Sequence, residues 1–140
     1  MFTKGKTLAL IKPDAMKNKY LGRIVSILDR TYTIEKMEMF HLNETQAKEF
    51  YKEHIGKPFF EANIKHMISG PIVAVVLSGK DDIIHRFRTL LGATDPRKST
   101  LGSLRRIFGE GLPNNAIHGS DSEKSANREI NFFFGSKYKI

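Results

Sequence analysis

Apolar side chains along the chain recur with two different spacings, which predict both strands and helices. Residues 7–12 and 72–77 are short and almost uninterrupted apolar runs, as expected for central strands covered on both faces. Residues 21–30 instead carry apolar side chains at i, i+3 and i+4 spacing, which is the pattern of a helix with one buried face. The pattern is typical of a domain in which helices pack on a sheet.

Prolines and capping residues mark the ends of several of these elements. Pro13 ends the first strand and favours extended geometry at Lys12, so we expect the Lys12 ammonium to project from a rigid element. Asn43 and Gln46 have the spacing of a capping box and predict a helix that runs to about residue 54. These boundaries separate the strands from the helices that follow them.

The complete pattern predicts an α+β sandwich in a single domain, residues 1–140. No linker rich in Pro, Gly or Ser divides the chain, and we find no internal repeat. In order, we expect a strand at 7–12, a helix at 21–30, a strand at 33–42, helices at 44–54 and 61–69, a strand at 72–77, a helix opened by acids at 81–91, an irregular segment at 92–114, a short strand closed by Ile117, and a helix capped by Asp121 or Ser122 that ends at Phe134.

Composition narrows the chemistry and the cellular setting. The sequence has no cysteine, which excludes disulfides, thiolate catalysis and thiolate metal sites and is compatible with a reducing cytosol. No apolar run approaches the length of a membrane span, and the apolar residues 8–11 are too few for a secretion signal. We therefore expect a cytoplasmic protein without a membrane partner.

The charge of the chain is strongly positive and partly local. Lys and Arg number 23 against 15 Asp and Glu, a formal net charge of +8. Between residues 86 and 106 the only acid is Asp95, among six basic residues. Such a cluster can bind phosphates or can simply form a solvated basic face, and charge by itself does not choose between these interpretations.

The chemistry that stands out is a histidine among small and polar residues. His118 lies within Asn-Ala-Ile-His-Gly-Ser-Asp-Ser, residues 115–122, without a metal-ligand partner nearby. An imidazole ordinarily has a pKa near 6.5, so at neutral pH it offers an unprotonated nitrogen that can attack phosphorus. His118 is therefore a candidate nucleophile, and the alternative is a capping or core histidine. The chain lacks a P-loop and the protein-kinase motifs, so side chains must hold any phosphates.

Three further stretches give this histidine a family context. Ile-Lys-Pro-Asp-Ala at 11–15, Lys-Pro-Phe-Phe at 57–60 and Leu-Gly-Ala-Thr-Asp-Pro at 91–96 precede the histidine motif in that order. Together they resemble the nucleoside diphosphate kinase family, over about residues 7–134. The resemblance implies a ferredoxin-like βαββαβ sandwich, with an antiparallel four-stranded sheet and added helices. It also implies a ping-pong transfer of the γ-phosphoryl group from a nucleoside triphosphate such as ATP to a nucleoside diphosphate.

The resemblance assigns the reacting groups residue by residue. His118 would be the phosphorylated nucleophile, and Glu129 and Ser120 would support it. Lys12 and Tyr51 would lie near the transferred phosphoryl group. Taken singly, each of these residues is more commonly an ordinary structural or surface residue, and their joint match to the family motifs supports the functional interpretation.

The resemblance also implies a set of nucleotide contacts. Phe59 would stack on the base and Leu112 would close the other side, which accounts for weak base selectivity because every base has a π-face. Phe60, in contrast, is expected in the core. The residues that match the family's nucleotide contacts are Lys12, Phe59, Arg88, Thr94, Arg105, Leu112 and Asn115.

The implied cofactor is Mg²⁺ bound to the nucleotide, without a direct protein ligand. Asp121 could hold a metal-bound water, although a helix cap is the preferred interpretation, and the remaining histidines lack the paired spacing of a zinc site. Members of the family form hexamers or tetramers, so the resemblance implies a homo-hexamer or a homo-tetramer.

Two positions depart from the family pattern, and two other function classes are open. Lys57 stands where arginine is common, and Arg106-Ile107 replaces a small and often acidic pair, so we expect Arg106 to add charge beside the site. The first alternative is a nucleic-acid-binding module that uses the +8 charge and Phe59 with Tyr51 to bind a single strand, and this partner class is secondary because it leaves His118 without a role. The second is a catalytically silent oligomeric scaffold.

Overall fold

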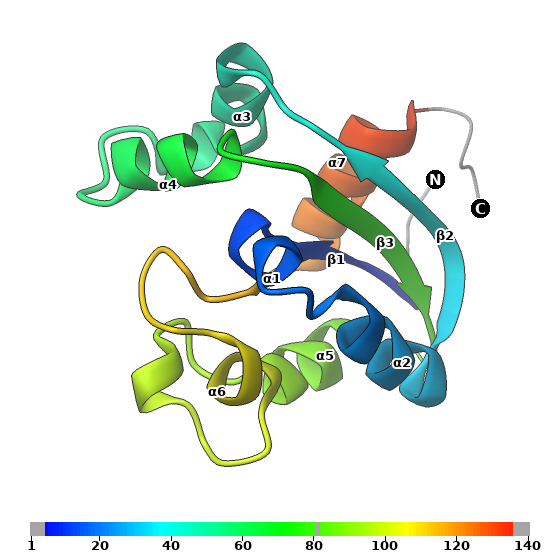
Figure 1. Ribbon diagram of the computed structural model, residues 1–140. Coiled ribbons are helices and arrows are strands. Elements are labelled where there is room, and N and C mark those ends of the chain that lie inside the picture. Colours follow the sequence, from blue (N-terminus) through cyan, green and yellow to red (C-terminus); the bar gives the residue numbers. More distant parts are fainter. Residues whose placement is uncertain (1–4, 81, 136–140) are drawn as a thin grey trace.

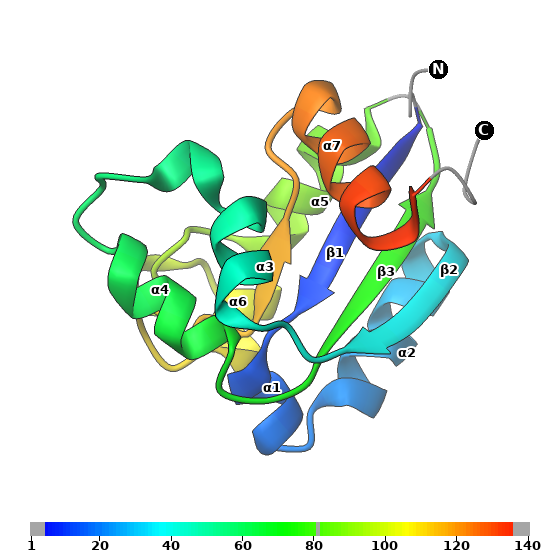
Figure 2. The same cartoon turned by 90° about the horizontal axis from the view of Figure 1, so that it is seen from above.

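The computed structural model describes residues 5–80 and 82–135. Its sheet has four strands in the order β2-β3-β1-β4, and every neighbouring pair is antiparallel (Figures 1 and 2). The fold is α+β and ferredoxin-like, as predicted. The strands are β1 (Lys6–Ile11), β2 (Thr33–Phe40), β3 (Ile72–Ser78) and β4 (Ile117–Gly119).

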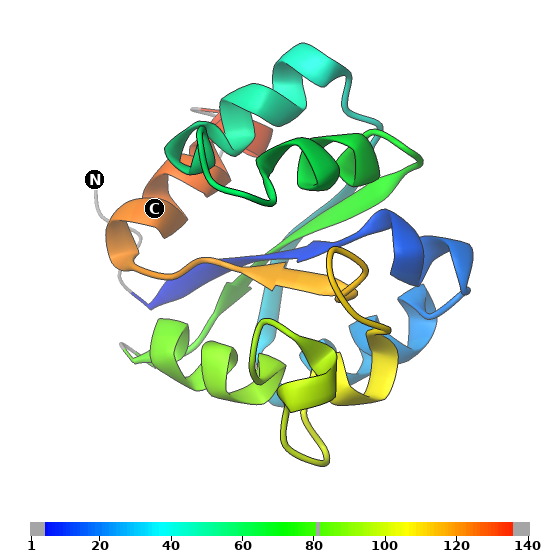
Figure 3. The same cartoon turned by 90° about the vertical axis from the view of Figure 1, so that its left-hand side faces the viewer.

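Helices cover both faces of the sheet (Figures 1 and 3). One face is covered by α3, α4 and α7, and the opposite face by α2, α5 and α6. The helices and 3-10 turns are α1 (Pro13–Lys17), α2 (Leu21–Thr31), α3 (Glu44–Phe50), η1 (Lys52–His54), α4 (Phe60–Met67), α5 (Ile83–Leu91), η2 (Pro96–Lys98), α6 (Leu104–Phe108) and α7 (Glu123–Phe134).

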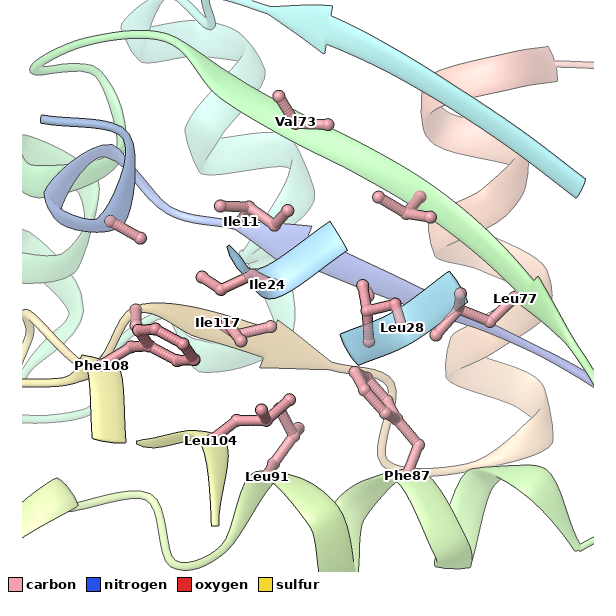
Figure 4. Close-up of a cluster of buried hydrophobic side chains, with 14 of the residues drawn as sticks. Ile11, Ile24, Leu28, Val73, Leu77, Phe87, Leu91, Leu104, Phe108 and Ile117 are labelled. Carbon is pink, nitrogen blue, oxygen red and sulfur yellow. The ribbon is translucent and has the colours of Figure 1, made fainter. Parts of the chain in front are cut away.

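The central strand β1 divides the core into two clusters. Ala9 and Ile11 face α2, α5 and α6, while Leu8 and Leu10 face α3, α4 and α7. Figure 4 shows the first cluster, in which Phe87 and Leu91 of α5 reach towards the sheet. Because successive side chains of a strand point to opposite faces, a strand covered on both sides must be apolar throughout. The expectation for residues 7–12 is therefore confirmed for β1.

Several predicted boundaries are wrong. Pro13 ends β1 but also begins a helix, α1, because proline fits the first turn, where its missing N–H is not needed. The segment expected to be irregular, 92–114, contains η2 and α6. The predicted helix 44–54 ends at Phe50 and continues as η1, and β2 ends at Phe40 rather than at residue 42.

The start of two late elements also differs from the prediction. Helix α5 begins at Ile83, and Asp82 forms an ion pair with Arg86 instead of capping the helix with its side chain. Asp81 lies outside the described residues. Ile117 opens β4 rather than closing it, because the ladder continues through His118. The capping box of α3 is confirmed in full, with reciprocal Asn43 and Gln46 hydrogen bonds.

Strand β4 brings the histidine motif next to β1 (Figure 2). The ladder pairs Leu10 with His118 and Ala9 with Gly119. Gly119 is packed against α5 so closely that an added Cβ would lie 2.6 Å from Leu91 Cδ1 and 2.9 Å from Phe87 Cε2. The histidine strand can therefore approach α5 only with glycine at this position.

We predict that Gly119→Ala destabilises the fold by about 1–3 kcal/mol, because the methyl group overpacks the core beside α5. Gly22→Ala is the matched control: nothing lies within 4 Å of its Cβ, and alanine in a helix should be neutral or stabilise the fold by about 0.5–1 kcal/mol. Urea denaturation of both variants measures the difference. Equal unfolding free energies for the two variants would contradict the packing argument.

Candidate active site

A cavity of about 460 Å³ opens beside the end of β1 and beside β4. The segment from α3 to α4, residues 44–67, also borders it and is called the α3–α4 hairpin below. Phe59, Asn63 and their neighbours form one wall, and residues from α5, α6 and the loop before β4 form the other. Ser120 is fully buried and does not line the cavity. The predicted site residues that line it are Lys12, Tyr51, Phe59, Arg88, Thr94, Arg105, Leu112, Asn115, His118 and Glu129.

His118 is held by a carboxylate on the following helix. Its Nε2 lies 2.9 Å from Oε1 of Glu129, and its ring meets the Phe50 ring edge-on at 5.5 Å. An ionised carboxylate can only accept, so Nε2 carries a proton, and in the neutral imidazole Nδ1 then keeps a free lone pair. This arrangement fixes the ring orientation and leaves one nitrogen nucleophilic.

Glu129 stays ionised although it is buried. Burial acts to raise the pKa of its carboxyl, but His118, a 2.7 Å hydrogen bond from Ser120 Oγ and the nearby Arg128 outweigh burial and lower that pKa below its usual range. Arg128 Nη2 lies 3.8 Å from the second carboxylate oxygen. The carboxylate can therefore compensate positive charge that develops on the imidazole.

Lys12 is buried at the end of β1 and lines the cavity. Its ammonium donates to Asn115 Oδ1 at 2.7 Å and to the Pro113 carbonyl at 2.8 Å. Burial lowers its pKa to about 8; Asp14 acts against this shift, and Arg105 adds to it. At neutral pH Lys12 is still mainly a cation, with one N–H left for a ligand in the cavity.

The guanidinium groups of Arg88 and Arg105 add two further positive charges to the cavity lining beside Lys12. Arg105 is buried and donates to the Ile117 carbonyl at 3.1 Å and to the Gly92 carbonyl at 3.3 Å. Burial and the neighbouring Arg88 lower the pKa of Arg105 to about 10, so it remains charged at neutral pH. Because each guanidinium has five N–H donors, both retain donors for anionic oxygens.

Aromatic and apolar side chains form the mouth of the cavity. Phe59 is 66% exposed and Leu112 is 42% exposed, whereas Phe60 is buried, as predicted. A large exposed aromatic face beside a cavity offers a stacking surface for a flat ligand. Thr94 also lines the cavity, and its carbonyl accepts from the Asn115 side chain at 3.0 Å.

Tyr51, which follows α3, lines the cavity together with two residues that the sequence motifs did not indicate, Asn63 of α4 and Arg128 of α7. Burial and nearby Glu129 raise the pKa of the Tyr51 hydroxyl, against a hydrogen bond from the Asn63 side chain. Arg128 donates to the Phe50 carbonyl at 3.1 Å and forms a 2.9 Å ion pair with Glu53. A single polar residue on an amphipathic helix gives no sequence signal of such contacts, because it looks like a solvated surface residue.

Arg106, expected beside the site, does not line the cavity. It is exposed, and its guanidinium donates to the Ser99 carbonyl at 3.2 Å. The contact fixes the loop between η2 and α6. Lys57, the other departure from the family pattern, does line the cavity and adds a cation near Phe59.

Acidic groups in the cavity are few. Asp121 lines it and accepts a 2.7 Å hydrogen bond from Ser125 Oγ, which is the main cause of its lowered pKa. The N-cap of α7 is Ser122, not Asp121. Across residues 5–80 and 82–135 no cluster of three or more His, Cys, Asp or Glu side chains could hold a metal ion.

In the same ranges, 5–80 and 82–135, no helix is long and apolar enough to cross a membrane.

Comparison with known proteins connects this geometry to a family. The family model for nucleoside diphosphate kinase matches residues 5–138. A nucleoside diphosphate kinase of Glaesserella parasuis is 47% identical over 130 residues, covering 92% of this chain and 94% of that protein. One from Lawsonia intracellularis is 42% identical over 135 residues, covering 96% and 97%.

Solved structures similar to this chain are also nucleoside diphosphate kinases. A crystal structure of the Aquifex aeolicus nucleoside diphosphate kinase superimposes with a TM-score of 0.90 at 40% identity, covering 96% of this chain and 98% of that one. The Encephalitozoon cuniculi enzyme, crystallised in its apo form, gives a TM-score of 0.91 at 28% identity, covering 97% and 92%.

The fold and a carboxylate-held histidine among cations define a phosphotransferase. The chain belongs to the nucleoside diphosphate kinase family. Its reaction is the transfer of the γ-phosphoryl group from a nucleoside triphosphate to a nucleoside diphosphate.

The depressed pKa of Lys12 predicts a pH-dependent nucleotide affinity. As pH rises through about 8, Lys12 loses the proton that a phosphate contact needs, so binding becomes weaker. We expect the Kd of a nucleoside diphosphate, measured by titration calorimetry, to rise about tenfold between pH 7 and pH 9. Lys12→Met should bind weakly at both pH values, with a flat profile. A Kd in the parent protein that is unchanged across this range would show that the Lys12 charge makes no contribution.

Proposed function

We propose that Nδ1 of His118 attacks the γ-phosphorus of a bound nucleoside triphosphate. The N–P bond forms as the bond from that phosphorus to the β–γ bridging oxygen breaks, and the nucleoside diphosphate leaves. A second diphosphate then takes the phosphoryl group from the phosphohistidine, and Nδ1 is free again. One site thus serves both substrates in turn, which is a ping-pong scheme. The observation that carries the proposal is the 2.9 Å contact from Nε2 to Glu129, which places the proton of a neutral imidazole on Nε2 and leaves Nδ1 as the nitrogen with the lone pair.

Positioning and charge neutralisation supply most of the catalysis in phosphoryl transfer. Lys12 and Tyr51 would contact the transferred phosphoryl group, and Arg88, Thr94 and Arg105 the remaining phosphates. Lys12 and Asn115, joined by a 2.7 Å hydrogen bond, would also contact the sugar hydroxyl side. These donors are fixed before substrate arrives, so little reorganisation is needed during the reaction.

Support for the nucleophile comes from the helix that follows it. Ser120 Oγ and His118 Nε2 share the same oxygen of Glu129, at 2.7 and 2.9 Å. This shared acceptor would hold the imidazole in one tautomer through both half-reactions. Phe59 and Leu112 would bind the base between them by stacking and apolar contact, without hydrogen bonds that select one base.

We propose that Mg²⁺ is bound to the phosphates of the nucleotide and enters the site with it. When bound, Mg²⁺ neutralises charge on the phosphate oxygens and commonly keeps several waters. Asp121 is a carboxylate in the cavity lining that could accept a hydrogen bond from such a water, and we assign no direct protein ligand. The cavity is lined mainly by positively charged donors, which bind phosphate oxygens but not metal ions. A magnesium ion held by the nucleotide phosphates fits this lining better than one held by protein ligands.

We also propose a homo-oligomer, either a hexamer or a tetramer, as the working form. In the described part of the chain β2 is an edge strand that pairs only with β3, and Met37 and Met39 on it are 49% and 56% exposed. Unprotected edges with apolar side chains favour pairing with another chain.

We propose that residues 1–140 form one kinase domain, and the family match to residues 5–138 supports this assignment. A cytoplasmic location fits the nucleotides that the enzyme uses.

Nucleic acid is a secondary partner class. The formal charge of +8 and the exposed Phe59 favour contact with a single strand. Such binding should fall steeply with salt and should survive His118→Ala. Phosphoryl transfer, in contrast, depends on His118 itself.

We expect the purified protein, incubated with Mg²⁺ and ATP labelled in the γ position, to acquire acid-labile label that moves to added GDP. His118→Ala should lose the label completely while it keeps most of its nucleotide affinity. His85→Ala is the matched control, because His85 is exposed on α5 and does not line the cavity. Label that persists in His118→Ala, or no label in the parent protein at saturating ATP, would refute the proposed mechanism.

A further inference from the structure

Asp14 is a buried carboxylate without a role in the reaction as proposed. It lies in α1, two residues after Lys12, and is only 6% exposed. Its Oδ2 accepts from the Ala116 backbone N–H at 3.0 Å, and its Oδ1 lies 2.9 Å from Nε2 of His66. Both oxygens are therefore engaged, by a loop residue next to the site on one side and by α4 on the other.

Ala116 needs this support because of its backbone conformation. Its φ is +72°, in the left-handed region that residues with a Cβ rarely adopt. Its carbonyl accepts from the Lys12 backbone N–H at 2.8 Å, while its N–H is held by Asp14. The segment around Lys12 thus holds both polar groups of Ala116, which stands between Asn115 and the start of β4.

We propose that Asp14 is a positioning residue for phosphoryl transfer, which fixes the chain at Ala116 and so sets Asn115 and His118 in their places relative to Lys12. The proposal rests on the roles given above to Lys12 and His118. His66 fixes the rotamer of Asp14 by binding its other oxygen. A displacement of about 1 Å at the reacting groups can cost roughly a hundredfold in rate, so a remote support of this kind has a measurable effect.

His66 connects this support to a second cavity, of about 610 Å³. Asp14 and His66 line it, together with Lys17 and Glu110, which are its other charged groups. The His66 side chain is 12% exposed and that of Asp14 only 4%, so the carboxylate is the less accessible of the two groups.

The Asp14 charge has a second effect, which can be separated from its geometry. Asp14 raises the pKa of Lys12 against the lowering by burial and by Arg105. Asp14→Asn keeps an oxygen that can accept from Ala116 but removes the charge, so the pKa of Lys12 should fall further below about 8. Asp14→Ala removes both the acceptor and the charge. The other titratable groups in the cavity lining are unchanged in both variants; they are Tyr51, Glu53, His54, Lys57, Arg88, Arg105, His118, Asp121, Arg128 and Glu129.

The test measures single-turnover formation of phosphohistidine from labelled ATP between pH 6.5 and 9.5. We expect Asp14→Ala to be slower by roughly ten- to a hundredfold at pH 7. Asp14→Asn should stay within about threefold of the parent at pH 7, with its alkaline limb moved to lower pH. Asp29→Ala, an exposed acid on α2, is the control and should match the parent. A rate for folded Asp14→Ala equal to that of the parent would overturn the proposal, as would Asp14→Asn as slow as Asp14→Ala at pH 7.

Amide hydrogen exchange at Ala116 gives a readout that does not depend on activity. Exchange should accelerate in Asp14→Ala and in His66→Phe and remain slow in Asp14→Asn. If Asp14→Ala does not fold, His66→Phe decides: faster exchange with slower transfer supports the proposal, and parental values of both overturn it. A parent protein that forms no phosphohistidine would refute the proposed function, whereas the exchange experiment would still report on the Asp14 contact.

Discussion

The arrangement of the site depends on the antiparallel pairing of β1 with β4. The ladder sets Leu10 opposite His118, and it continues past the strand end through the 2.8 Å hydrogen bond from Lys12 N–H to the Ala116 carbonyl. This pairing brings His118, the proposed nucleophile, close to the buried Lys12, although more than a hundred residues separate them in sequence. Because β1 is also paired with β3 and covered on both faces, neither group can shift without disturbing the core.

A second constraint is the burial of charge around this pairing. Lys12, Arg105, Glu129 and Asp14 are all nearly inaccessible to solvent, and an unpaired charge in such a place would be strongly unfavourable. Each is compensated by fixed partners: carbonyl oxygens for Lys12 and Arg105, a hydroxyl and an imidazole for Glu129, an amide N–H and an imidazole for Asp14. The same fixed partners leave donors aimed into the cavity, so the network that offsets the cost of burial also prepares the site for phosphates.

The sequence predicted the fold class and the central elements because their signals are local. The apolar run of β1, the apolar face of α2 and the capping box of α3 each arise within a few neighbouring residues. Helices α1 and α6 were missed for the opposite reason: each has five residues and is stabilised by packing rather than by its own periodicity. The residues expected at the site came from motifs, and motifs do not report contacts such as those of Arg128 and Asn63.

By itself, then, the sequence determined an α+β chain with a histidine among hydroxyls and an acid, and through its motifs it indicated the kinase family and its reaction. Only the tertiary structure decided that Lys12 is buried, and that Arg106 binds a loop carbonyl outside the cavity. It alone also joined Asp14 to His66 and Ala116. The physical reason is that periodicity and capping are short-range properties of the chain, whereas burial, pKa and hydrogen-bond partners depend on residues that meet only when the sheet has formed.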